Sequence, residues 1–178
     1  MSWPATIAHR RFIDRYQNLE SRQMHYPSEA NDFQAPHAAL LGDSYLKLLH
    51  RPLIGGECGS KAFARALFEA PFAVVSHDTE ADPIFNYANR KAQELFGMDW
   101  QEFTRTPSRY SAEPVNREER QRLLDQVDRH GFIDHYQGVR ISKQGRRFMI
   151  RNAVVWNLSD DDGLYRGQAA CFAEWLYL

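Results

Sequence analysis

The sequence contains little cysteine: its two cysteines, Cys58 and Cys171, lie far apart and form no CxxC pair. This excludes a disulfide framework, and a reducing, cytoplasmic setting is the simplest expectation. No run of about 18 apolar residues is present, which excludes a membrane-spanning helix. Residues 1–17 place charges where a signal peptide needs an apolar stretch, so we expect no secretory leader.

Neither sign of charge is in excess. The chain has 22 Lys and Arg against 23 Asp and Glu, a formal net charge of -1. This balance gives no electrostatic reason for broad binding to nucleic acid or to an anionic membrane. We therefore expect neither as a partner.

The chain is long enough for one domain that folds without disulfides or metals. It has 178 residues, of which 43% are hydrophobic and 13% aromatic. We expect a helical extension in residues 1–35 and a single α+β domain in 36–178. Within that domain, residues 36–70 form a helical lead-in and residues 71–178 form the core.

Two helical patterns precede the core. Residues 5–24 predict a polar helix, and residues 37–50 predict a second helix with one apolar face. That face is long enough to pack on a sheet or to pair with a second chain, so we expect a homodimer. It consists of Leu41, Tyr45, Leu48 and Leu49.

Capping signals predict four further helices. They begin after Ser60, Asn89, Asp99 and Asn116. Asp99 with Glu102, and Asn116 with Glu119, have the spacing of a capping box. The helix after Asn89 should run to Phe96 and end at Gly97, and the last helix should end at Gly131.

Alternating apolar residues predict five strands, over residues 72–76, 84–88, 133–142, 147–157 and 165–175. Short turns make consecutive strands antiparallel, and the helices between the second and third strands must cross one face of the sheet. The expected fold is α+β, a five-stranded antiparallel sheet with a helical flap on one face and N-terminal helices. This is the layout of a PAS domain.

The chain also resembles a known family. PFAVVSHDTEADPIFNYANRKAQELFGMDWQEFT looks like the start of a PAS domain, with two strands, a closing Asn and a helix finishing in Leu-Phe-Gly. LFEAPFAVVSH, ADPIFNYANRKAQELF, TPSRYSAEPVNREER, GVRISKQGRRFMI, VVWNL and YRGQAACFAEW together resemble bacterial MEKHLA-domain proteins over about residues 36–175. That family is PAS-like and similar to the C-terminal domain of plant class III homeodomain–leucine zipper factors.

The resemblance implies a PAS fold and a sensory or regulatory role, with no established enzymatic activity to carry over. The string Met-Glu-Lys-His-Leu-Ala is absent here. The homeodomain and zipper of the plant proteins are absent as well, so DNA binding does not transfer.

Cofactor chemistry of the known PAS types finds little support. Some haem-binding PAS domains use a histidine within the long helix before the third strand, but here His130 sits at the end of that helix, where it complements the helix dipole. His130 and His135 flank Gly131, which gives no rigid metal-ligand spacing. Light-sensing flavin domains need a cysteine near SRYSAEP, and none is present. Covalent flavin chemistry is not expected, non-covalent binding stays open, and the cofactor is unknown.

Ser76, His77 and Asp82 suggest a catalytic triad. Successive strand residues point to opposite faces, so Ser76 and His77 cannot share one hydrogen-bonded site. We interpret them as the end of the first strand and the start of its turn. No catalytic residue is predicted, and the protein is not expected to be an enzyme.

A basic cluster surrounds the hairpin at residues 138–152. It could form a nucleic-acid face, but we favour a solvated outer face with the arginine stems covering the sheet. In that arrangement the strand residues of the opposite phase point inward, namely Val139, Ile141, Phe148, Ile150, Val154 and Trp156. The cluster consists of Arg140, Lys143, Arg146, Arg147 and Arg151.

The candidate ligand-binding residues are polar or aromatic side chains on the strands and one loop arginine. If they point inward, they supply the few fixed polar groups that orient a ligand; Tyr136 and Trp156 could instead be core aromatics. The loop residue Arg109 could clamp a carboxylate or phosphate, or tie its loop to a helix dipole or to Glu113. The candidates are Asn86, Tyr87, Arg109, Tyr136, Asn152, Trp156 and Gln168.

Three functions remain open at this stage. The favoured one is a sensory or regulatory module that binds a small molecule and signals, through a change of shape, to a partner protein acting in trans. The alternatives are a ligand-free interaction or dimerisation module and a small cavity-based enzyme. A cavity of about 300 Å³ or more favours a ligand, whereas a packed interior with an exposed apolar patch favours a partner.

Overall fold

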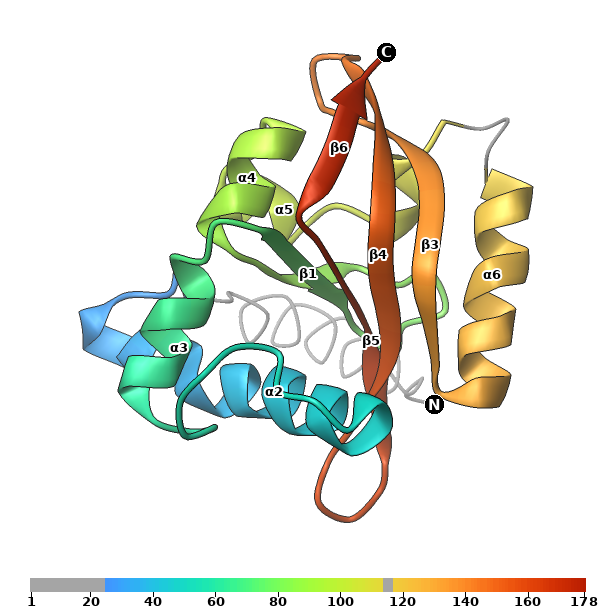
Figure 1. Ribbon diagram of the computed structural model, residues 1–178. Coiled ribbons are helices and arrows are strands. Elements are labelled where there is room, and N and C mark those ends of the chain that lie inside the picture. Colours follow the sequence, from blue (N-terminus) through green and yellow to red (C-terminus); the bar gives the residue numbers. More distant parts are fainter. Residues whose placement is uncertain (1–24, 114–116) are drawn as a thin grey trace, which may run out of the picture.

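The computed structural model describes residues 25–113 and 117–178. The helix expected over residues 5–24 and the capping residue Asn116 lie outside the described residues. The helices are η1 (Glu29–Gln34), α2 (Ala35–Leu49), α3 (Lys61–Phe68), α4 (Arg90–Phe96), α5 (Trp100–Phe103), η2 (Ser108–Ser111) and α6 (Arg117–His130) (Figure 1).

The strands form one antiparallel sheet. They are β1 (Ala73–His77), β2 (Phe85–Ala88), β3 (Phe132–Ile141), β4 (Arg147–Ser159), β5 (Tyr165–Phe172) and β6 (Glu174–Tyr177). The order is β2-β1-β5-β4-β3, and β6 also pairs with β4. The expected five-stranded sheet is thus confirmed, except that the last strand is interrupted at Ala173 and both of its parts pair with β4.

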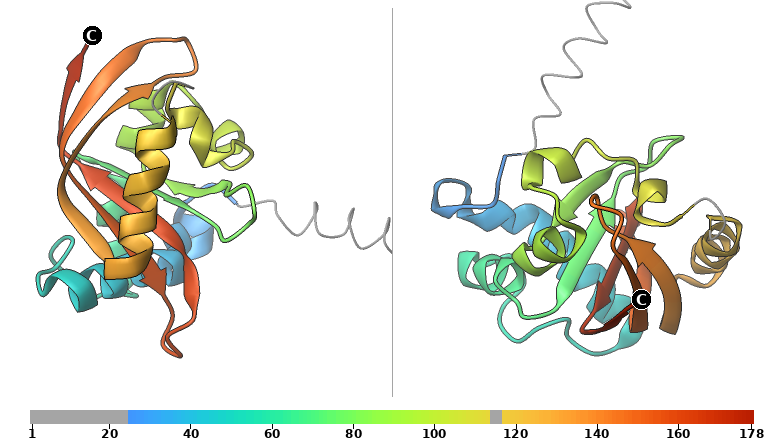
Figure 2. Two further views of the ribbon diagram at one scale, coloured as in Figure 1. Left: turned by 90° about the vertical axis from the view of Figure 1, so that its right-hand side faces the viewer. Right: turned by 90° about the horizontal axis from the view of Figure 1, so that it is seen from above.

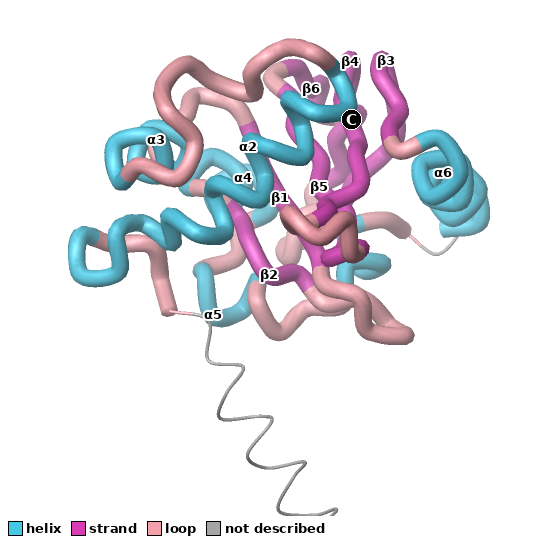
Figure 3. The backbone as a smooth tube through the Cα atoms, turned by 90° about the horizontal axis from the view of Figure 1, so that it is seen from below, coloured by secondary structure: helices cyan, strands magenta, loops and turns pink. Residues whose placement is uncertain are grey.

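Helices cover both faces of the sheet (Figures 2 and 3). The inner face packs against α4, α5 and α6, as predicted for the helical flap. The outer face packs against α2 and α3. On α2, the side chains of Leu41 and Tyr45 are buried against the sheet, so the apolar face of this helix packs on the sheet rather than on a second chain.

The predicted caps are confirmed wherever the structure describes them. The Ser60 hydroxyl accepts the Phe63 amide at 3.1 Å, and Asp99 and Glu102 form a reciprocal capping box. Helix α4 ends at Gly97 in the left-handed conformation that glycine favours.

Asn89 is the most connected of these caps, and its side chain is fully buried. Its Oδ1 accepts the amides of Val74 at 2.9 Å and Ala92 at 3.1 Å. Its Nδ2 donates to the carbonyls of Phe72 at 2.7 Å and Leu67 at 3.3 Å. One carboxamide therefore joins the end of α3, strand β1 and the start of α4.

Two bulges change which face the strand residues occupy. His135 on β3 and Asn152 on β4 both have left-handed backbone conformations, and the pairing register shifts around them. As a result Ile150 shares the inner face with Val155, whereas Trp156 faces α2. The prediction that Phe148, Ile150, Val154 and Trp156 share one face is wrong, because a bulge inverts the alternation.

Gly167 allows β5 to approach the end of β1. Its φ is +120°, and a Cβ atom at this position would overlap the carbonyl oxygen of His77. Only glycine accommodates both the backbone conformation and the contact. The close pairing of these strands at one end of the sheet depends on this residue.

We expect Gly167→Ala to lower the free energy of unfolding by about 3 kcal/mol or more, because backbone strain and a backbone clash add together. The matched control is Gly163→Ala in the same hairpin, where φ is +78° but no atom lies within 4 Å of the added Cβ. That variant should lose only about 1 kcal/mol. Urea denaturation measures both changes, and equal losses would contradict the close-approach role.

Candidate functional site

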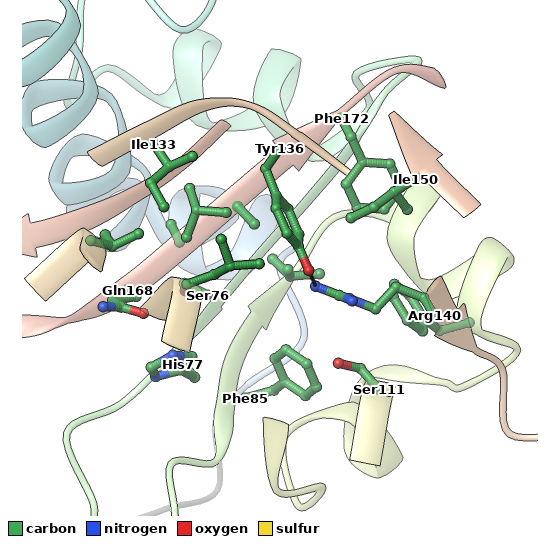
Figure 4. Close-up of a pocket in the computed structure, with 17 residues that line it drawn as sticks. Ser76, His77, Phe85, Ser111, Ile133, Tyr136, Arg140, Ile150, Gln168 and Phe172 are labelled. Carbon is green, nitrogen blue, oxygen red and sulfur yellow. Dashed lines mark hydrogen bonds between the residues drawn. The ribbon is translucent and has the colours of Figure 1, made fainter. Parts of the chain in front are cut away.

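A cavity lies between the inner face of the sheet and the helices η2 and α6 (Figure 4). Its volume is about 60 Å³. Most of its wall is apolar and comes from strands β1 to β5 and from helices α4 and α6. The main apolar contributors are Phe85, Val127, Ile133, Ile150, Val155 and Phe172.

Six polar residues also line this cavity, namely Ser76, His77, Ser111, Tyr136, Arg140 and Gln168. The Ser111 hydroxyl donates to the Ser108 carbonyl at 2.8 Å, and His77 Nδ1 lies 2.8 Å from the Asp78 carbonyl oxygen. Gln168 Nε2 donates to Asp128 on α6 at 2.7 Å. Polar groups from the sheet and from the flap therefore meet around an apolar space.

Tyr136 and Arg140 form a pair on β3. Arg140 Nη2 donates to the Tyr136 hydroxyl at 3.0 Å, and the guanidinium carbon lies 5.3 Å from the ring centroid. Gly138 stands between them on the same face of the strand, and a Cβ there would overlap the Tyr136 hydroxyl. The Y-x-G-x-R pattern thus lets the tyrosine hydroxyl and the guanidinium form a hydrogen bond.

Two of the predicted ligand residues, Tyr136 and Gln168, line the cavity. Arg109 does not. It forms a bidentate ion pair with Asp82 at 2.9 and 3.0 Å and stacks on Tyr110, with its side chain 43% exposed. Neither a helix dipole nor Glu113 is its anchor: Arg109 ties the η2 loop to the β1–β2 turn.

The other four predicted residues lie away from the cavity. Tyr87 and Trp156 are fully buried on the outer face, where neither Tyr87 Oη nor Trp156 Nε1 has a hydrogen-bond partner among the described residues. Asn86 accepts a hydrogen bond from Ser76 at 2.6 Å. The bulge residue Asn152 donates to the exposed carboxylate of Glu174 at 3.1 Å.

Ser76 and His77 point to opposite faces, as predicted. Both residues border the cavity, but the hydroxyl of Ser76 faces α2, where its Oγ lies 2.9 Å from His37 Nε2. The Ser76 proton goes to Asn86, so the imidazole donates to Ser76 rather than removing its proton. This orientation does not activate Ser76 as a nucleophile.

The residues considered for cofactor chemistry also lie outside the cavity. Cys171 is buried on the outer face, and burial raises the pKa of its thiol to about 12. His130 Nδ1 donates to the Gln126 carbonyl at 3.0 Å, as expected for the end of a helix. In the described part of the chain no group of three His, Cys, Asp or Glu residues could hold a metal ion.

The basic cluster divides between both faces, so the single solvated face predicted for it is wrong at Arg140. This residue pairs across the strands with Phe148 on the inner face. Lys143 pairs with Glu102, Arg146 stacks on Tyr177 and Arg147 pairs with Glu113. The hairpin residues thus contact neighbouring side chains.

Sequence reasoning missed His77, Ser111 and Arg140 as cavity residues. The bulge at His135 is invisible in the alternation pattern, which without it places Arg140 on the outward face. The available signal was the spacing of Tyr136, Gly138 and Arg140, which puts a glycine between two polar side chains on one face of a strand.

An antiparallel sheet in the order 2-1-5-4-3, covered by a helical flap over a cavity, defines a PAS-like domain. The PAS domain of a protein from Colwellia psychrerythraea is similar, with a TM-score of 0.55 and 17% identity over 62% of this chain and 92% of that one. The light-state dimer of the fungal blue-light photoreceptor Vivid has a TM-score of 0.52 and 17% identity, covering 74% and 92%. These likenesses show the fold.

The family follows from the sequence itself. The model of the MEKHLA domain matches residues 35–177, and the chain belongs to this family. No curated protein matches the chain. Among the described residues, no helix combines the length and the apolar character that crossing a membrane requires.

The partly buried His37 makes stability depend on pH. Burial between α2 and the sheet lowers its pKa from 6.5 to about 4, and its ring stacks on Tyr87 at 5.4 Å. The unfolded chain therefore binds a proton below pH 6.5 that the folded chain binds only near pH 4. We expect this residue to remove up to about 3 kcal/mol of stability as the pH falls from 6.5 to 4, and to have no effect above 7.

Chemical denaturation at several pH values checks this. His37→Gln keeps an N–H donor for Ser76 but does not titrate, so its stability should fall less steeply between pH 6.5 and 4. The control is His130→Gln, whose side chain is exposed at the end of α6. Parallel curves for wild type and His37→Gln would show that the imidazole is not the titrating group.

Proposed function

We propose that this chain is a sensory or regulatory PAS-like module that binds a small molecule between sheet and flap and signals to a partner by a change of shape. PAS-like domains are typically sensory. The observation that carries the proposal is the apolar cavity, with polar side chains from β1, β3, β5 and η2 on its wall. Such a mixture is typical of sites that bind and orient small molecules.

The volume of the cavity restricts its occupant. At about 60 Å³ it is well below the roughly 300 Å³ that sites for drug-sized ligands reach. A molecule of a few non-hydrogen atoms suits the space, and a larger one requires the flap to move outward. The proposal is therefore for a small ligand, or for one that displaces η2 and α6.

Contacts at the edge of the flap suggest how such a movement would be transmitted. The turn between β3 and β4 holds the end of α4, because the Lys143 amide donates to the Phe96 carbonyl at 2.9 Å and Gln144 Nε2 to the Gly97 carbonyl at 2.9 Å. Lys143 also pairs with Glu102 on α5. In this proposal, β3 forms part of the cavity wall, and a shift of this strand is transmitted to the flap through these hydrogen bonds.

The alternative is a ligand-free interaction module, and the small volume of the cavity favours it. The exposed apolar residues Leu176 and Leu178 lie at β6 and just after it, and among the described strands β6 pairs only with β4. In this version a homodimer or a partner protein acting in trans would cover the edge of β6. A cytoplasmic location fits both versions. A cavity-based enzyme is the weakest alternative.

Native mass spectrometry and absorption spectra of freshly purified protein test the choice. The sensor function predicts an added small mass that is lost on denaturation. The variant Ala170→Val should reduce its occupancy at least several-fold, because two methyl groups enter a cavity of about 60 Å³. The native mass spectra also give the number of copies of the chain in each particle.

The control for this variant is its thermal unfolding without ligand, since overpacking by itself costs about 1–3 kcal/mol. A clean apo mass, together with a thermal-shift screen that finds no binder, would contradict the sensor function. A particle of two copies without any added mass would instead support the interaction module.

A further inference from the structure

Arg140 brings a positive charge to the wall of the apolar cavity. Its side chain is partly buried, and it is the only lysine or arginine among the described residues that line this space. Two of its five N–H donors have protein acceptors, the Tyr136 hydroxyl at 3.0 Å and the Val139 carbonyl at 2.9 Å. In the described part of the chain no carboxylate forms an ion pair with it.

Three surface arginines are arranged differently. Arg109, Arg147 and Arg166 each pair with a carboxylate, although their side chains are about half exposed. Arg140 is partly buried and shares the cavity wall with apolar side chains such as Phe85 and Ile150, yet no carboxylate of the described residues forms an ion pair with it. A cation in such a place costs free energy unless an anion compensates it.

The strand is built to hold this cation in place. Tyr136, Gly138 and Arg140 follow one another on the inner face of β3, and only the missing side chain of Gly138 lets the Tyr136 hydroxyl reach the guanidinium. The hydroxyl and the guanidinium together form a fork of donors at one side of the cavity (Figure 4). Donors fixed in this way match a planar, two-oxygen acceptor.

We infer that the ligand of this cavity is a small carboxylate, bound by Arg140 and Tyr136, with a short apolar tail against Val127, Ile133 and Ile150. This inference rests on the proposed function, since it names the chemistry of the ligand. A single cation balances the single charge of a carboxylate, whereas a phosphate group carries about -1.5 to -2 at pH 7. The volume of about 60 Å³ limits the tail to a few carbon atoms.

NMR titration at pH 7 tests the inference with three probes: propionate, its neutral counterpart propionamide and inorganic phosphate. Propionate should shift the amide signals of β3 and α6 and bind with a dissociation constant of roughly millimolar. Propionamide, of the same size, should bind at least tenfold more weakly, because the interaction with the guanidinium is lost.

Arg140→Met keeps an unbranched apolar side chain but removes the guanidinium, and it should weaken propionate binding at least tenfold. The matched control is Arg146→Met on the same hairpin, where the guanidinium stacks on Tyr177 outside the cavity; its affinity should not change. Tyr136→Phe removes only the hydroxyl and should weaken binding several-fold, which keeps the test valid should Arg140→Met fail to fold.

Each other result overturns the inference in a distinct way. Equal binding of propionate and propionamide, unaffected by Arg140→Met, would mean that the cavity binds a ligand but does not recognise a carboxylate. Binding of phosphate alone would show a different anion. No shift with any probe would also reject the carboxylate, and the mass of a co-purifying molecule then decides separately whether the proposed function stands.

Discussion

The buried carboxamide of Asn89 is the constraint on which the arrangement of this domain depends. This side chain bonds at once to the end of α3, to β1 and to the first turn of α4. The helices of the outer face and the flap of the inner face are thereby fixed to the same point of the sheet. With its four bonds made inside the core, the carboxamide is satisfied only when all three elements are in place.

The space beneath the flap follows from this arrangement together with the two strand bulges. Asn89 sets where the flap begins, and the bulges at His135 and Asn152 turn Tyr136, Arg140 and Val155 toward the flap. On the other face the same bulges turn Trp156 toward Tyr45 of α2, at a centroid distance of 5.0 Å. One face of the sheet is thus a packed aromatic core, and the other retains a small cavity with a charge on its wall.

Much of the fold could be predicted from the sequence because its signals are local. Ser60, Asn89 and Asp99 with Glu102 act within three residues of their helix starts, and the turns between strands make neighbouring strands antiparallel. The candidate site was less predictable, because the face of the sheet on which a strand residue lies depends on bulges, and because residues in contact are far apart in the sequence. A single bulge puts Arg140 on the inner face, and the contact between His37 and Ser76 spans 39 residues.

The central claim is that the space between β3, η2 and α6 is where this domain receives its signal. Amide hydrogen exchange, compared between freshly purified protein and protein refolded from denaturant to remove bound molecules, tests it most directly. We predict faster exchange in β3 and α6 after the bound molecule is removed, with exchange in α2 and α3 unchanged. Of these four elements, only β3 and α6 border the cavity. Identical exchange in β3 and α6, or a change confined to α2 and α3, would contradict it.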